Sequence, residues 1–148
     1  PIPNSLFPVP CSLFPVPCSL FPVPFPLKPM SKVLVVDDVP SELELICRIL
    51  QNAGLEVMRA SDGEEAIATI QATTPDLVIL DVIMPRMNGF EVVRELRDNK
   101  KTQNLPIVFC TQKNTDIDRA WGSELGADAY IGKPFDPQQL LDIVQRLL

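Results

Sequence analysis

The sequence contains no histidine among its 148 residues. This absence excludes imidazole acid–base chemistry, histidine-ligated metal and a phosphohistidine carried by this chain. Metal-ligand spacing is also absent from the four cysteines, which are Cys11, Cys18, Cys47 and Cys110. We therefore expect neither a zinc site nor a disulfide framework, and reduced thiols in a cytoplasmic protein fit this pattern best.

Basic side chains are scarce. The chain has 13 Lys and Arg against 19 Asp and Glu, and Lys28 is the only charged residue before position 31. Binding to nucleic acid needs a basic face, so a nucleic-acid partner is not expected. No apolar run approaches the roughly 18 residues of a membrane span, so no membrane insertion is expected either.

Glycine is missing from the first 30 residues, which hold ten of the 16 prolines and repeat the unit SLFPVPC. We interpret residues 1–29 as a disordered, polyproline-like tail, with a spacer or proline-motif ligand as the alternative. An export signal is not expected, because prolines interrupt any apolar helix and no basic segment begins the chain. Our hypothesis is that this stretch is translated repeat DNA, built on the heptanucleotide CCCTGTT, upstream of a start at Met30. Residues 30–148 form one domain in this interpretation.

After Met30, apolar runs alternate with segments of helical periodicity. Strands are predicted at 32–36, 55–60, 76–80, 105–110 and 127–132. Helices are predicted at 40–54, 61–72, 89–100, 114–125 and 136–148. The alternation predicts an α/β fold, a doubly wound sheet of five parallel strands in the order 2-1-3-4-5 with helices on both faces. A capping box between Ser61 and Glu64 is expected to begin the second helix, and Asp136 to begin the last.

Polar side chains follow four of the five predicted strands. They are Asp37 and Asp38 after the first, Asp81 after the third, Thr111 after the fourth and Lys133 after the fifth. Each has an ordinary interpretation in isolation, as a turn, a helix cap or a solvated charge. Ligands of such sheets bind at the carboxyl ends of the strands, where the strand order would bring these groups together.

Carboxylates gathered in one pocket repel one another unless a positive group intervenes. Mg²⁺ is the expected cofactor, because it prefers oxygen ligands and is held by one or two carboxylates plus a phosphate. Lys133 adds a second positive charge and Thr111 a hydroxyl donor. Asp81 could then act as the nucleophile that forms an aspartyl-phosphate.

From Met30 to the carboxyl terminus the chain resembles a response-regulator receiver domain of two-component signalling. The stretches that carry the resemblance are VLVVDD, DLVILDVIMPRMNGFEVVRELR, PIVFCT and GADAYIGKPF. The resemblance implies the flavodoxin-like receiver fold. It also implies that Asp81 is the phosphoacceptor and that a separate histidine kinase is the phosphoryl donor.

The same resemblance implies further roles at the strand ends. Mg²⁺ would be held by Asp37, Asp38, Asp81 and the backbone carbonyl of Ile83. Lys133 and Thr111 would contact the phosphoryl oxygens. The peptide bond between Lys133 and Pro134 would be cis.

A two-state switch formed by Thr111 and Tyr130 is also implied by the resemblance. The alternative for Tyr130 is a half-buried strand aromatic with its hydroxyl in water. The switch would bias a surface on the fourth helix, fifth strand and fifth helix, where an output protein would dock. Two flanking residues, Ile83 and Lys113, are expected to limit the access of hydrolytic water.

Because the chain stops at Leu148, we expect a single-domain regulator that acts by protein binding, of the chemotaxis or twitching-motility kind. The stretch 112–135 is similar to regulators of type IV pilus motility. No enzyme activity is expected beyond the domain's own phosphotransfer and dephosphorylation. Trp121 is expected to pack its helix against the sheet, whereas an exposed Trp121 would mark a partner site.

Two other functions remain open. The first is a phosphate sink or relay intermediate without an output partner, and the second is a receiver-like binding scaffold. A phosphatase with an aspartyl nucleophile is disfavoured, because it would normally carry a second Asp where Ile83 stands.

Overall fold

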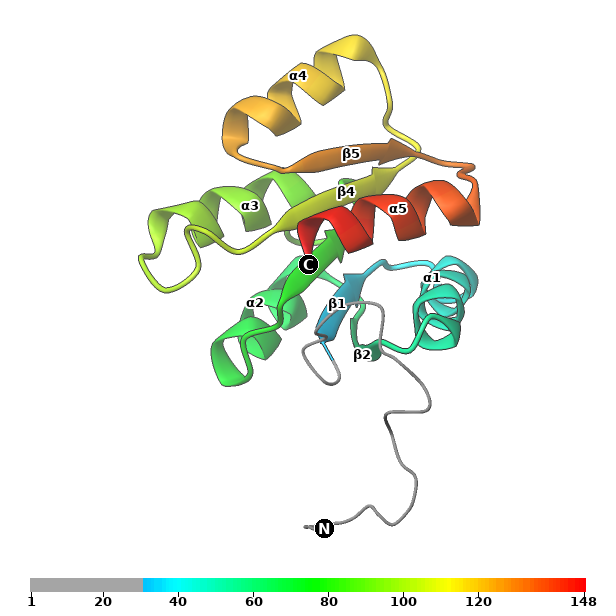
Figure 1. Cartoon of the computed structure of the whole chain (residues 1–148). Coiled ribbons are helices and arrows are strands. Elements are labelled where there is room, and N and C mark those ends of the chain that lie inside the picture. The colour runs from blue at the N-terminus through cyan, green and yellow to red at the C-terminus, as the bar shows by residue number, and fades with distance from the viewer. Residues whose placement is uncertain (1–30) are drawn as a thin grey trace, which may run out of the picture.

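The computed structural model describes residues 31–148. The predicted proline-rich tail, with Cys11 and Cys18, and the boundary at Met30 lie outside these residues. The strands are β1 (Lys32–Val36), β2 (Glu56–Ala60), β3 (Leu77–Leu80), β4 (Ile107–Thr111) and β5 (Ala129–Gly132). The helices are α1 (Pro40–Asn52), α2 (Gly63–Ala72), α3 (Gly89–Asp98), α4 (Asp116–Leu125) and α5 (Pro137–Leu147), and they alternate with the strands along the chain (Figure 1).

The strands form one sheet in the order β2-β1-β3-β4-β5. Every neighbouring pair is parallel. The predicted fold class and strand order are therefore confirmed. All of the strands end at the same edge of the sheet, so the residues that follow them gather there.

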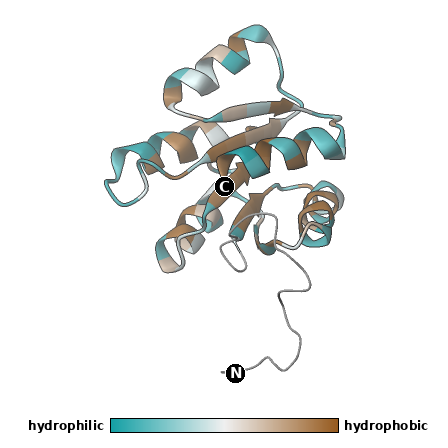
Figure 2. Cartoon of the chain, in the orientation of Figure 1, coloured by the Kyte–Doolittle hydropathy of each residue, from teal (hydrophilic) through white to brown (hydrophobic). Residues whose placement is uncertain are grey.

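The sheet separates two apolar cores. On one face Leu34 and Val36 of β1 join residues of α2, α3 and β4. On the other face Val33 and Val35 join residues of α1 and α5. This alternation along β1 is the period of two that a strand imposes on its side chains. Apolar residues accordingly concentrate in the sheet between the helical layers, while the outer helical surfaces are hydrophilic (Figure 2). Both faces of the central strands are covered, which explains their continuous apolar sequences.

The start of α2 differs from the prediction by one residue. The expected box between Ser61 and Glu64 is wrong, because Asp62 is the N-cap and accepts the amide of Glu65 at 2.8 Å. The carboxylate of Glu65 in turn accepts the amide and the hydroxyl of Ser61, each at 2.8 Å. Aspartate caps as well as serine does, and an ion pair between Asp62 and Arg86 holds the carboxylate in place. The predicted cap of α5 is present, since Asp136 accepts the amide of Gln138 at 3.0 Å.

The two cysteines in residues 31–148 serve in packing. Cys47 and Cys110 are buried and free, and both belong to the core that α1 and α5 cover. Burial raises the pKa of the Cys110 thiol to about 12. That thiol is therefore neutral at physiological pH and behaves as a small apolar group.

None of the helices that the structure describes combines the length and the apolar content that a bilayer crossing requires.

Candidate functional site

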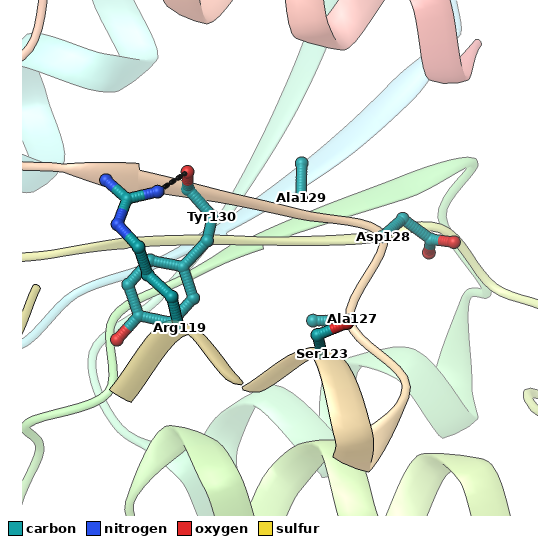
Figure 3. A pocket seen from close by; sticks show the side chains of 6 residues that line it. All are labelled: Arg119, Ser123, Ala127, Asp128, Ala129 and Tyr130. Carbon is teal, nitrogen blue, oxygen red and sulfur yellow. Dashed lines mark hydrogen bonds between the residues drawn. The ribbon is translucent and has the colours of Figure 1, made fainter. Parts of the chain in front are cut away.

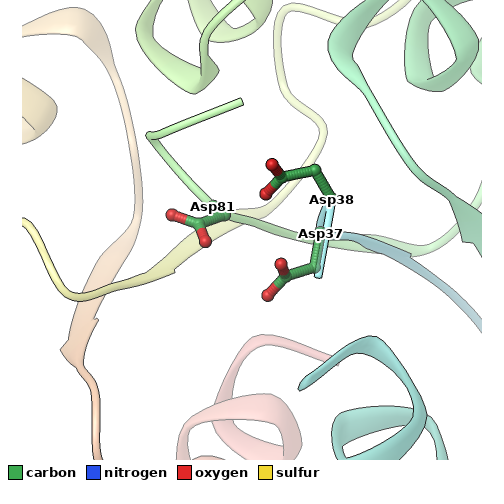
Figure 4. Close-up of side chains that lie close together, drawn as sticks. All are labelled: Asp37, Asp38 and Asp81. Atoms are coloured by element: carbon green, nitrogen blue, oxygen red, sulfur yellow. The ribbon is translucent and has the colours of Figure 1, made fainter. Parts of the chain in front are cut away.

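Three aspartates converge at the carboxyl edge of the sheet (Figure 4). Asp37 follows β1 and Asp81 follows β3, and these strands pair with Val36 opposite Leu80. The register therefore places Asp37 and Asp81 side by side, with Asp38 next along the chain. Each aspartate offers one carboxylate oxygen, and these oxygens all lie within 4.8 Å of one another. The acidic cluster predicted from the strand ends is thus present.

Local backbone amides orient the two buried carboxylates. One oxygen of Asp37 accepts the amide of Val39 at 3.0 Å. One oxygen of Asp81 accepts the amide of Ile83 at 3.1 Å. In both cases the bond reaches two residues ahead, so the chain turns away and leaves the carboxylate at the strand end. Each aspartate keeps its second oxygen for other partners.

Helix α3 approaches the end of β3 closely, and Gly89 makes this approach possible. A Cβ atom at position 89 would lie 2.3 Å from the carbonyl oxygen of Asp81 and 2.9 Å from the ring of Phe109. No side chain fits in that space. Gly89 therefore allows the chain to return directly beneath Asp81, which fixes the loop between β3 and α3.

Lys133 contacts three carboxylates through one ammonium group. Its Nζ atom donates to Asp37 at 2.6 Å, to Asp81 at 3.0 Å and to Glu42. Burial would lower the pKa of Lys133, but these hydrogen bonds raise it above its ordinary value. The lysine is therefore a permanent cation in the pocket. The peptide bond from Lys133 to Pro134 is cis, the conformation that the resemblance implied.

Glu42 was missed at the sequence level. It lies in the first turn of α1, two residues after Pro40, where an acidic side chain is usually explained by the helix dipole. The signal that could have found it is its place beside the strand ends, because α1 begins two residues after Asp38. With Glu42 the pocket holds four carboxylates and one ammonium.

The pocket carries an excess of negative charge. Burial raises the pKa of Asp37, although hydrogen bonds from Lys133 and Val39 act in the opposite direction. A nearby cation stabilises the charged form of a carboxylate that burial disfavours. Oxygen atoms from three carboxylates at short mutual distances are the ligands that a hard divalent ion prefers, so the residues present fit Mg²⁺.

A hollow of about 150 Å³ opens beside the acidic cluster. Its lining residues are Asp38, Val39, Glu42, Asp81, Ile83 and Gln112. This volume suits a small anionic group and falls below the roughly 300 Å³ at which pockets for larger organic ligands begin. Ile83 lines this hollow and is 58% exposed.

Thr111 and Tyr130 are linked through the backbone of Lys113. The buried hydroxyl of Thr111 accepts the amide of Lys113 at 3.1 Å. The hydroxyl of Tyr130 donates to the carbonyl of the same residue. Tyr130 is half-buried on β5, as the alternative expected, and its hydroxyl bonds to a backbone carbonyl. A switching role for the pair stays a prediction.

The ring of Tyr130 forms part of a second hollow, of about 220 Å³, between α4 and β5 (Figure 3). The guanidinium of Arg119 lies 5.3 Å from the centre of that ring and donates to the carbonyl of Tyr130 at 3.1 Å. The only carboxylate in the lining is Asp128, which pairs with Arg97 at 3.2 Å. This hollow therefore lacks the converging acids of the first one.

The expected packing of Trp121 against the sheet is wrong. Trp121 is 45% exposed, and Ile117, one turn earlier in α4, is 81% exposed. The residue that faces the sheet is Gly122, where an added Cβ would lie 3.0 Å from the ring of Tyr130. The close approach of Tyr130 to Gly122 turns the helix by one residue from the phase that its apolar spacing predicted.

Comparison with known proteins identifies the family. The sequence profile described as "Response regulator receiver domain" matches residues 33–145. The chain belongs to this family. Its receiver domain is a response regulator of two-component signalling, and the convergence of aspartates and lysine described above lies within the matched region.

The receiver domain is similar to curated proteins of two kinds. It is 34% identical over 119 residues to Protein PilH of Pseudomonas aeruginosa, covering 80% of this chain and 98% of that protein. It is 42% identical over 118 residues to the alkaline phosphatase synthesis transcriptional regulatory protein PhoP of Bacillus subtilis. In that comparison it covers 80% of this chain but only 48% of the relative, so it spans about half of the transcriptional regulator's length.

Among solved structures, the receiver domain resembles chemotaxis protein CheY4 of Vibrio cholerae. The TM-score is 0.76 with 40% sequence identity, and the match covers 80% of this chain and 99% of that one. The described fold therefore agrees with that of a chemotaxis response regulator over nearly its whole length.

Proposed function

We propose that Asp81 accepts a phosphoryl group from the phosphohistidine of a separate histidine kinase, and that the phosphorylated chain signals by binding an output protein. The observation that carries this proposal is the contact of Asp81 with Lys133 at 3.0 Å inside a cluster of three aspartates. These 148 residues contain no histidine, so a phosphohistidine donor would lie outside them.

In the proposed reaction, an Asp81 carboxylate oxygen attacks the phosphorus atom. The new O–P bond forms as the P–N bond of the phosphohistidine breaks. The imidazole nitrogen of the donor keeps the electron pair of that bond and takes up a proton. Lys133 neutralises charge on the phosphoryl oxygens, and the Thr111 hydroxyl, which accepts from Lys113, keeps its own proton to donate to them.

Asp37, Asp38 and Asp81, with the backbone carbonyl of Ile83, are the residues that would hold Mg²⁺. When bound, the ion supplies positive charge that offsets the repulsion between these carboxylates and an incoming phosphoryl group. Burial raises the pKa of Asp37 despite its hydrogen bond from Lys133, and a further cation beside this carboxylate would favour its charged form.

The output surface in this proposal comprises α4, β5 and α5. Support comes from the exposed Trp121 and Ile117 on α4, since large exposed apolar residues are typical of protein contact sites. The bonds from Thr111 and Tyr130 to Lys113 give the phosphoryl site a direct connection to β5. A change at Thr111 would then bias the position of Tyr130 and the surface around it.

The pathway we favour is motility or chemotaxis in the cytoplasm. The similarity to PilH and to a chemotaxis CheY4 supports this choice. A phosphate sink or relay intermediate is the alternative that shares the same chemistry, and a mere scaffold would have no use for the complete acidic pocket. The domain's only catalysis in this proposal is its own phosphotransfer and dephosphorylation.

Incubation with acetyl phosphate and Mg²⁺, followed by mass measurement of the intact protein, tests the central claim. The unaltered chain should gain one phosphoryl group, and Asp81→Asn should gain none. Asp98→Asn, at the exposed end of α3, is the matched control and should behave like the unaltered chain. An unaltered chain that gains no mass would overturn the proposal.

An output partner is tested separately. A partner should bind more tightly to the chain saturated with beryllium trifluoride, a phosphoryl analogue, than to the free chain. Equal affinities for every candidate partner would favour the sink.

A further inference from the structure

All three N–H groups of the Lys133 ammonium have hydrogen-bond partners. An ammonium carries three N–H groups, and here it has three carboxylate partners, Asp37, Glu42 and Asp81. The Lys133 side chain is only 6% exposed, so water does not offer it a ready fourth partner. Phosphorylation removes the carboxylate charge of Asp81 and lets one phosphoryl oxygen take over its contact with Lys133, so any further phosphoryl contact with Lys133 has to displace Asp37 or Glu42.

The three carboxylates differ in how readily they can give up this contact. The side chains of Asp37 and Asp81 are 1% and 9% exposed, whereas that of Glu42 is 33% exposed. A carboxylate that loses its cation is stabilised by water in proportion to its access to water. Loss of the contact with Lys133 therefore costs the least free energy at Glu42. Glu42 also lines the same hollow as Asp81.

We propose that Glu42 is a positioning residue that competes with the phosphoryl group for Lys133. This inference rests on the proposed phosphorylation of Asp81. In the free chain Glu42 draws the ammonium toward α1 and so weakens its hold on Asp37 and Asp81, which leaves their oxygens more available to a metal ion. In the phosphorylated chain the same carboxylate competes for the lysine and adds a negative charge beside the phosphoryl group, which shortens the lifetime of the phosphorylated state.

Two consequences of opposite sign follow for Glu42→Gln. Without the glutamate charge, Lys133 pairs more tightly with Asp37 and Asp81, so Mg²⁺ should bind the free chain more weakly. The phosphoryl group has one carboxylate competitor fewer for Lys133, so beryllium trifluoride should bind more tightly at saturating Mg²⁺, and phosphate should be lost more slowly. We expect each change to be about two- to tenfold, the range for a partly exposed ion pair.

The matched control is Glu44→Gln. Glu44 lies on the same helix, two residues further along, and pairs with Arg59 at 2.6 Å and Arg48 at 3.5 Å rather than with Lys133. The substitution Glu44→Gln removes the same charge from α1 but leaves the residues of the pocket unchanged. Glu42→Ala is a second variant, which removes the polar end of the side chain altogether. Thermal melting of each variant shows whether it is folded.

Mg²⁺ affinity is measured by calorimetry on the full chain, beryllium trifluoride affinity by the same method, and the phosphorylated lifetime by mass measurement after removal of acetyl phosphate. Weaker Mg²⁺ binding together with a longer lifetime in Glu42→Gln, and neither change in Glu44→Gln, is the expected result. Glu42→Gln that matches Glu44→Gln overturns the inference, and so does a parallel fall in all three quantities. In either case phosphorylation of the unaltered chain still stands. An unaltered chain that takes up no phosphoryl group overturns the proposed function and this inference together.

Discussion

Two nitrogens of the Arg97 guanidinium donate to one oxygen, the carbonyl of Gly126, with Nε at 3.1 Å and Nη2 at 2.7 Å. Nη1 donates to the carbonyl of Leu105 at 2.7 Å, and Nη2 also reaches Asp128 at 3.2 Å. One side chain of α3 therefore joins the segment before β4 to the end of α4, at the sheet edge opposite the acidic pocket. Burial lowers the pKa of Arg97, although Asp128 acts in the opposite direction.

Arg97→Met should lower the free energy of unfolding by about 1–3 kcal/mol, because it leaves partly buried carbonyls without donors. Urea unfolding of the full chain measures this loss. The control is Arg94→Met, one turn earlier in α3 and exposed, which should stay within about 0.5 kcal/mol of the unaltered chain. If Arg97→Met lowers the free energy of unfolding no more than Arg94→Met does, these hydrogen bonds do not stabilise the fold.

Gly89→Ala should disturb the phosphoryl site and not only the fold. The added methyl would clash with the carbonyl of Asp81, so either α3 or the end of β3 has to move. We expect a loss of about 1–3 kcal/mol in stability from overpacking. Phosphoryl uptake from acetyl phosphate should slow by about tenfold or more, because Asp81 is misplaced.

Asn88→Ala separates these two effects. Asn88 caps α3 and exchanges hydrogen bonds of 2.9 Å with Glu91. Its loss should reduce stability by about 1 kcal/mol, as for other N-caps, while phosphoryl uptake stays unchanged. Equal slowing of uptake in the two variants would show that general loosening of α3, and not the position of Asp81, is responsible.

Asp62→Asn should change how stability depends on pH. The amide of Glu65 and the guanidinium of Arg86 hold the pKa of Asp62 below its ordinary value of 3.8. The unfolded chain therefore binds this proton more readily, so the stabilisation is complete above the unfolded pKa and is lost as pH falls through the folded pKa.

Asparagine keeps the cap but not the charge, so the variant lacks this contribution at every pH. The difference in stability between Asp62→Asn and the unaltered chain should accordingly shrink as pH falls below 3.8. Urea unfolding across the acid range measures it. Asp142→Asn, on the exposed side of α5, is the control. A difference for Asp62→Asn that stays constant with pH would contradict the argument.

Ile83→Asn should accelerate loss of phosphate several-fold. Ile83 lines the hollow together with Asp81, and replacing its apolar side chain by an amide gives water a polar path to the phosphoryl group. The decay is followed by mass measurement after the phosphodonor is removed. Ile117→Asn makes the same change at an exposed position on α4 and should leave the decay unaltered. An unchanged rate for Ile83→Asn counts against a shielding role for this residue.

The sheet could be predicted from the sequence because its central strands are covered on both faces. KVLVV and DLVIL are continuous apolar runs for that reason, and the polar residues that end them had to lie at the carboxyl edge. Asp37, Asp38 and Asp81 were therefore placed together by topology alone. No distance between them was needed for that inference.

Features that depend on side-chain geometry across elements could not be predicted in this way. Glu42 reaches Lys133 over 91 positions of sequence, and nothing local distinguishes it from an ordinary acidic residue in a first helical turn. Trp121 has the spacing of a core residue, but the contact between Gly122 and Tyr130 decides which face of α4 meets the sheet. The sequence predicts an ordinary exposed charge for Arg97, because its carbonyl partners are brought to it only by the fold.

The link between Thr111 and Tyr130 runs through the amide and carbonyl of Lys113 and does not use its side chain. That side chain points elsewhere and pairs with Asp118 at 3.3 Å. The residue at position 113 can therefore be exchanged for one of another size or charge, provided that it has a backbone amide, without breaking either hydrogen bond of this connection to β5.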